Sequence, residues 1–152
     1  MKRIILFCFV LLLVSCKSKN AAVVNKSSEI VKPVAVEVIK KKRADDLGER
    51  LLETCNTSRF RAFTSAEATE KVRQNATKEK ISAVCKKINQ RNGRFLGIAL
   101  IDITYYRNTE EYVFRYSINY EKKYYKRELF VTVNAENKVS AISTKEIEPK
   151  PL

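Results

Sequence analysis

Four cysteines and the absence of histidine limit the chemistry that this 152-residue chain can perform. Histidine is the commonest general base near neutral pH and a frequent metal ligand, so its absence excludes Ser-His-Asp and Cys-His catalysis. The four cysteines have different expected chemistry and stand at Cys8, Cys16, Cys55 and Cys85. No further catalytic or metal-ligating motif occurs in the sequence. We therefore predict a protein that is not an enzyme and that uses no cofactor and no metal site.

The first sixteen residues have the three parts of a secretory signal peptide. Lys2 and Arg3 form a positive start, and residues 4–14 are an unbroken apolar run of 11 residues. Ser15 supplies the small residue that precedes a signal cleavage site. Because a helix needs about 20 apolar residues to span a bilayer, this run predicts export and removal of residues 1–15.

The residues around the predicted cut, Leu13, Val14, Ser15 and Cys16, match all four positions of a known pattern. They resemble the lipobox of bacterial lipoproteins: an aliphatic residue, a small or aliphatic residue, a small residue, then cysteine. The resemblance implies that the Cys16 thiol receives a diacylglyceryl group and that cleavage follows Ser15. The freed amine is then acylated, commonly with palmitate. Two or more acyl chains hold a protein firmly on a membrane. The alternative is an ordinary signal peptide with an incidental cysteine.

Lys17 follows the predicted lipidation site. In the enterobacterial lipoproteins that the lipobox resembles, aspartate at this position retains the protein in the inner membrane. The resemblance therefore implies an outer-membrane lipoprotein. Residues 17–20 also lack the acidic residues of surface-export signals, which favours the periplasmic face of the cell envelope.

Basic residues outnumber acidic ones, 30 to 17, and give a formal net charge of +13. Such a charge attracts polyanions, although its even spread along the chain also suits simple solubility, and no specific nucleic acid is expected. Residues 16–42 combine Lys, Ser, Asn and small apolar residues around Pro33. They predict the lipidated cysteine and a flexible tether. The alternation of Val34, Val36 and Val38 would permit a strand instead.

After the tether, apolar residues recur first at helical and then at strand spacing. Leu47, Leu51 and Leu52 share one helical face and predict a helix over 43–57. Thr64 and Glu67 form a capping box before a second helix ending near residue 74. A third helix over 78–91 ends at Gly93. Alternation then predicts strands over 95–106, 112–120, 125–133 and 138–145, the first covered on both faces.

Helices followed by consecutive antiparallel strands predict an α+β domain over residues 43–147, with N-terminal helices on a four-stranded meander and a tail over 148–152. Three features of the domain resemble a known family. They are the helix order, Gly93 before the first long strand, and residues 128–133 followed by Lys138 and Val139. The domain is similar to the cystatin-like α+β roll of the nuclear transport factor 2 superfamily, especially its small secreted bacterial members. That resemblance implies a concave pocket between sheet and helices, which enzyme members line with Asp, His or Tyr.

All seven tyrosines lie between residues 105 and 125, and cations accompany the last of them. Aromatic rings interleaved with cations can stack on bases or sugars and pair with phosphates. Tyrosine also favours strands for packing alone, and Tyr112, Tyr116 and Tyr120 share the expected core face. The remainder is the predicted contact surface: Lys122, Lys123, Tyr124, Tyr125, Lys126 and Arg127.

Two carboxylates, Asp102 and Glu128, stand in or beside apolar strands. A carboxylate in an apolar pocket can act as a base when its pKa is raised, whereas charges on strands are usually solvated. Asp45 and Asp46 lie near the expected start of the first helix, where acidic residues favour the helix dipole.

Cys55 and Cys85 remain after export and lipidation of the chain. Both lie on the apolar faces of their expected helices. In an oxidising compartment they can form a disulfide if those faces meet, and otherwise they stay as two buried thiols.

The sequence thus predicts a lipid-anchored envelope protein that acts as a non-enzymatic binding or structural module. Its expected partners are the membrane and either an envelope protein or a polyanion. Two other functions remain open: a polyanion-binding accessory protein that uses the basic Tyr-rich hairpin, and a pocket enzyme of the α+β roll type.

Overall fold

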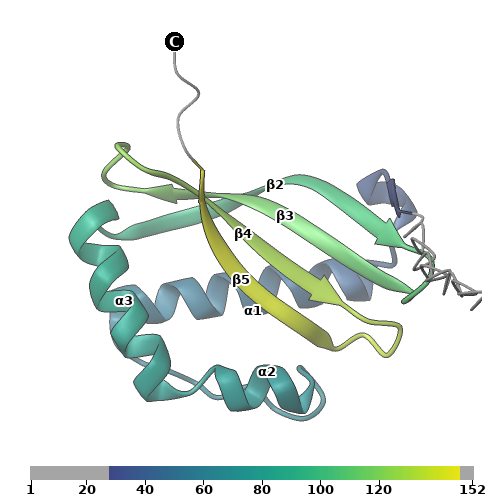
Figure 1. The fold of residues 1–152 in the computed structure, drawn as a ribbon, viewed down its shortest axis with the longest axis horizontal. Coiled ribbons are helices and arrows are strands. Elements are labelled where there is room, and N and C mark those ends of the chain that lie inside the picture. Colours follow the sequence, from purple (N-terminus) through teal and green to yellow (C-terminus); the bar gives the residue numbers. More distant parts are fainter. Residues whose placement is uncertain (1–27, 148–152) are drawn as a thin grey trace, which may run out of the picture.

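Three α-helices pack against one face of a five-stranded antiparallel sheet in the computed structural model, which describes residues 28–147 (Figure 1). The strands lie in the sheet in chain order, β1-β2-β3-β4-β5. The elements are β1 (Ser28–Ile30), the 3₁₀ helix η1 (Pro33–Ala35), α1 (Val38–Thr57), α2 (Glu70–Asn75), α3 (Lys78–Asn92), β2 (Phe95–Tyr106), β3 (Glu111–Tyr120), β4 (Lys126–Val133) and β5 (Val139–Ile147). The predicted α+β class is confirmed.

The core lies between α1 and the inner face of the sheet. Phe114, Leu129 and Val131 from the strands and Leu47 from α1 are all at most 1% exposed. Gly48 of α1 permits this close approach, because a Cβ at that position would lie 2.8 Å from Leu129 Cδ2. The alternating side chains of the strands point to the opposite, outer face, which none of the described helices covers.

The third predicted helix and the four predicted strands match the structure within two residues at each end. In α3 the Thr77 hydroxyl accepts a hydrogen bond from the Lys80 N–H (3.4 Å), which caps the first turn. Gly93 ends the helix with a φ of +74°. Strong periodicity with defined end signals was sufficient to place these elements.

The predicted boundary between tether and domain at residue 42 is wrong. β1 adds a fifth strand, and α1 begins at Val38, five residues before the predicted start. Val36 and Lys40 are 5% and 4% exposed. Lys40 Nζ donates to Asn137 Oδ1 (2.6 Å) in the turn between β4 and β5. Lys40 belongs to a run of four basic residues, and such a run is normally exposed to solvent. The sequence pattern therefore gave no sign that Lys40 is buried against a distant turn.

The predicted second helix is shorter and starts later than expected. Glu67 does reach back to the Thr64 N–H (2.9 Å), as a capping box requires, but the chain makes only one turn there. Ala68 then forms a parallel bridge with Val139, and α2 starts at Glu70. Pairing with β5 interrupts the helix that local sequence would otherwise begin.

A disulfide joins α1 to α3. The Sγ atoms of Cys55 and Cys85 are 2.06 Å apart, and the two Cα atoms are 4.8 Å apart. The side chain of Asn89 donates to the carbonyl oxygen of Cys55 (2.7 Å) beside the bridge. These contacts fix the end of α1 against α3.

The β2 strand is covered on one face, not on both as its apolar composition suggested. Leu96 and Ile101 are 63% and 43% exposed. Both fall where the pairing with β3 shifts register, so a local irregularity turns each side chain outward. Within residues 28–147, no helix combines the length and apolar character needed to cross a membrane.

Candidate functional site

A groove of about 750 Å³ lies beside the turn of the β3–β4 hairpin. Ser117, Asn119 and Glu128 alternate with buried residues of their strands, so they line it on the outer face of the sheet. Leu96 and Ile147 contribute apolar walls. Five of the six predicted contact residues also line it: Lys122, Lys123, Tyr125, Lys126 and Arg127. We call this site the basic groove.

Two of the four cations in the basic groove are free to bind a ligand. Arg127 is committed, because its guanidinium pairs with Glu146 (3.2 Å) and donates to Thr144 Oγ1 (2.9 Å). Lys122 Nζ donates to the carbonyl oxygen of Gln90 (3.2 Å). The side chains of Lys123 and Lys126 are exposed and form no hydrogen bond or ion pair with other residues of the described part.

Tyr124 and Tyr125, both predicted contact residues, have different environments. Tyr124 is 82% exposed and lies outside the groove lining. Tyr125 is 40% exposed, and the Arg91 guanidinium lies 4.2 Å from the centre of its ring. One face of the Tyr125 ring is therefore occupied by a cation, which fixes the ring at the groove wall.

The turn between β3 and β4, whose residues line the basic groove, and β1 lie at opposite ends of the sheet (Figure 1). β1 pairs with the last three residues of β2, whereas Phe95, the first residue of β2, pairs with Tyr120 beside the hairpin. A 12-residue strand at ~3.3 Å per residue separates these ends by about 35 Å.

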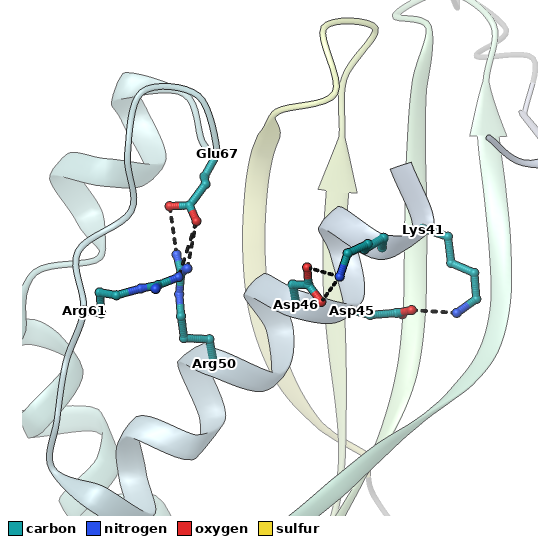
Figure 2. Close-up of polar contacts among 7 residues, drawn as sticks. Lys41, Asp45, Asp46, Arg50, Arg61 and Glu67 are labelled. Carbon is teal, nitrogen blue, oxygen red and sulfur yellow. Dashed lines mark hydrogen bonds and ion pairs between the residues drawn. The ribbon is translucent and has the colours of Figure 1, made fainter. Parts of the chain in front are cut away.

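A second set of charges lies on α1 and the loop before α2 (Figure 2). Arg50 binds Glu67 through two hydrogen bonds (2.8 and 3.0 Å), and Arg61 approaches the same carboxylate (3.6 Å). These side chains border a hollow of about 570 Å³ in which three arginines face four carboxylates. Because the carboxylates outnumber the arginines by one, this hollow is a weaker anion site than the basic groove.

Asp45 and Asp46 lie well inside α1, since the helix begins at Val38. Their expected interaction with the helix start is therefore wrong. Each pairs with the lysine one turn earlier. Asp45 pairs with Lys41 (2.6 Å; Figure 2), and Asp46 pairs with Lys42 (2.9 Å). Asp45 also accepts a hydrogen bond from the buried Tyr116 hydroxyl (2.7 Å), and this environment raises the Tyr116 pKa through burial and then the hydrogen bond.

Replacing Glu67 by glutamine should weaken the fold in a pH-dependent way. The Arg50 hydrogen bonds hold the Glu67 pKa at about 2, below its ordinary value of 4.5. This shift stabilises the folded state by roughly 3 kcal/mol above pH 4.5, and the contribution disappears as the pH falls toward 2. Urea unfolding should show a wild-type advantage over E67Q at pH 7 that shrinks at pH 3. E136Q, which alters a side chain 70% exposed, is the control. A pH-independent difference would contradict this account.

The two candidate catalytic carboxylates share one cation on the outer face. Arg115 donates to Asp102 Oδ2 (2.5 and 3.1 Å), and its guanidinium lies 3.5 Å from Glu128. Both carboxylates thus belong to a surface ion network. They do not lie in the apolar pocket that base catalysis would need.

Between α2, α3 and β5 lies a small apolar cavity of about 210 Å³, near the place where the family resemblance implied a pocket. Leu51, Val72 and Ile81 line it, and its lining includes no carboxylate. Across the described residues, no group of three or more Cys, Asp or Glu side chains could hold a metal ion. Ser15 and Cys16 lie outside the described residues.

Sequence reasoning found the cations of the basic groove and missed its walls. Leu96 precedes Lys122 by 26 residues and Ile147 follows Arg127 by 20 residues, so only the register of the paired strands brings them to the groove. The polar outer positions Ser117 and Asn119 were the available signal, because small polar residues alternated there with core residues.

Comparison with known proteins gives no match to this chain among family models, curated proteins or solved structures. The resemblance of its domain to the cystatin-like roll therefore stays a prediction.

Proposed function

We propose that this chain is a bacterial envelope lipoprotein that is cleaved before Cys16 and held on a membrane by acyl groups on that cysteine. It acts as a non-enzymatic binding module. The lipobox residues support the anchor, and Lys17 favours the periplasmic face of the outer membrane. The domain at residues 28–147 would then carry the binding function.

The basic groove is the observation that carries the binding proposal. Its lining includes four cations and a single carboxylate, Glu128. Lys123 and Lys126 have no partner within the described part of the chain, so binding an anion costs no internal ion pair. The apolar walls and the fixed Tyr125 ring add contact area beside the charges. A polyanion of the envelope, with phosphates or carboxylates at regular spacing, is the ligand class that fits these features best.

The orientation of the domain supports the same function. The tethered end and the basic groove are separated by about 35 Å along the sheet, so the groove faces away from the anchor. A ligand outside the plane of the membrane can therefore reach it. The absence of a carboxylate from the apolar cavity at β5, and the pairing of Asp102 and Glu128 with Arg115, favour binding over catalysis.

Reversing two groove charges should weaken polyanion binding at least tenfold. The variant Lys123→Glu with Lys126→Glu removes the two free cations. Its affinity for fluorescently labelled inorganic polyphosphate should be compared with that of wild type between about 50 and 200 mM salt. Loss of two phosphate contacts should also reduce the slope of log affinity against log salt by about two.

The matched control changes Lys78 and Lys86 to Glu, two exposed lysines of α3 outside the groove lining. It carries the same charge change, so it should bind nearly as wild type does. Equal losses in both variants would mean that only net charge matters, which rejects the groove as the site. Unchanged polyphosphate binding in the groove variant would show that the polyanion binds elsewhere on the chain, and this would also reject the groove as its site.

A further inference from the structure

Four aliphatic side chains at the N-terminal end of the domain are exposed to solvent. Ile30 is 77% exposed, Val34 86%, Val38 82% and Ile39 52%. They come from β1, η1 and the first turn of α1, within ten residues of one another. We call them the N-terminal apolar patch. Large aliphatic side chains that are exposed at one end of a domain indicate a surface that another molecule covers.

The charges around this patch are largely neutralised. Glu29 pairs with Arg107 (2.6 Å), and Glu37 lies 3.5 Å from Lys40 Nζ. Lys32, between Ile30 and Val34, is exposed and unpaired within residues 28–147. The acidic groups near the patch thus present little repulsion to an anionic surface, and the lysine adds attraction.

Tyrosines lie at the same end of the sheet. β1 pairs with Tyr105 and Tyr106 at the end of β2, and the ring of Tyr105 stacks on that of Tyr112 at 4.6 Å. Tyrosine is enriched where a protein meets the headgroup level of a membrane, because its ring is apolar and its hydroxyl is polar.

The position of the proposed anchor makes the membrane the expected partner of the N-terminal apolar patch. Cys16 precedes Ser28 by twelve residues, which reach at most about 40 Å when extended. A lipid on Cys16 therefore keeps this end of the domain close to the bilayer at an effective concentration on the order of millimolar. Weak apolar contacts that would not bind a free protein become favourable at such a concentration.

We infer that the N-terminal apolar patch docks on the surface of the lipid bilayer, with its aliphatic side chains at the boundary between headgroups and acyl chains. The inference rests on the proposed anchor at Cys16. It adds a fixed orientation: the domain stands with its sheet directed away from the membrane and the basic groove at the far end. The tether then limits the reach of the domain without letting it tumble freely.

The chain contains no tryptophan, so a single substitution provides a fluorescent reporter. The variant V38W places the reporter in the patch, and Y124W places it at the far hairpin. The two positions are matched, because Val38 and Tyr124 are each 82% exposed. Each lipidated protein is incorporated into vesicles of phosphatidylethanolamine and phosphatidylglycerol, with or without lipids brominated near the headgroup. Vesicle flotation reports whether the protein is anchored.

The V38W emission should shift to shorter wavelength on vesicles and fall at least twofold with brominated lipid, while Y124W emission should not change. Adding Val34→Ser and Ile39→Ser to V38W should reduce the quenching. Quenching that persists undiminished would mean that the tryptophan inserts by itself, and this would overturn the inference.

Two further results would overturn it and would separate it from the anchor. Floated protein in which V38W is unquenched would show an intact anchor without docking. A blue shift that needs no vesicles and grows with protein concentration would show that a second copy covers the patch. Protein that fails to float would overturn the anchor and the docking together.

Discussion

Replacement of Cys16 by alanine should abolish incorporation of labelled palmitate and remove the mature protein from the membrane fraction. The thiol is the predicted attachment point of the diacylglyceryl group, so the variant keeps the apolar run but loses the lipid. A lipoprotein peptidase that requires the lipidated cysteine would leave C16A as an uncleaved precursor. Gel mobility, fractionation and metabolic labelling of the chain expressed with its own first sixteen residues would measure these outcomes.

Cys8→Ala provides the matched control for this experiment. Cys8 lies in the apolar run and leaves with the signal peptide in the proposed maturation, so its replacement should change neither labelling nor fractionation. A C16A protein that is still cleaved after Ser15 and still sediments with membranes would show that the anchor proposal is wrong. Another feature of the chain would then hold it on the membrane.

Removal of the disulfide should lower the free energy of unfolding by about 3 to 4 kcal/mol. Cys55 and Cys85 are 30 residues apart, and a bridge of that span restricts the unfolded chain by roughly this amount in the chain-entropy model. The double variant Cys55→Ser with Cys85→Ser should therefore unfold at a clearly lower urea concentration. Cys85 is 8% exposed, so the serine hydroxyl also loses solvation there.

Reduction of the wild-type protein provides a control that breaks the bridge without substituting any residue. Alkylation without reductant should leave both cysteines unmodified in the exported protein, and mass measurement after reduction should reveal two alkylated sites. Equal stability of oxidised and reduced protein would mean that the bridge adds nothing to the fold. Alkylation of both cysteines without reductant would show that the bridge is absent.

Helices and strands in which apolar residues recur at regular spacing were predictable from the sequence. Elements that form only by pairing with distant segments were not. α3 repeats apolar residues at helical spacing and ends at Gly93, and β3 alternates from Tyr112 to Tyr120. β1 has only three residues, all exposed, and exists because β2 offers it an edge. No local pattern could place such a strand.

The candidate site was predictable to the same extent. The basic hairpin residues have a conspicuous composition, and five of them line the groove. The sequence could not show which of these side chains are free to bind a ligand. Arg127 pairs with Glu146 of β5, and Tyr125 contacts Arg91 of α3, so both depend on tertiary structure. Lys40 is the clearest case: it stands among four consecutive basic residues, yet it alone is buried.

In the proposed maturation, the contact of Lys40 with the β4–β5 turn implies that lipid attachment and folding occur in a definite order. Lys40 Nζ and Asn137 Oδ1 belong to residues 97 positions apart, and Val133 and Val139, on either side of that turn, are fully buried. The fold therefore closes only after nearly the whole chain is available, which makes it slow relative to local helix formation. A chain that crosses a membrane with its N-terminus first exposes Cys16 long before that point. Lipid attachment would then precede folding, and the domain would assemble while already tethered.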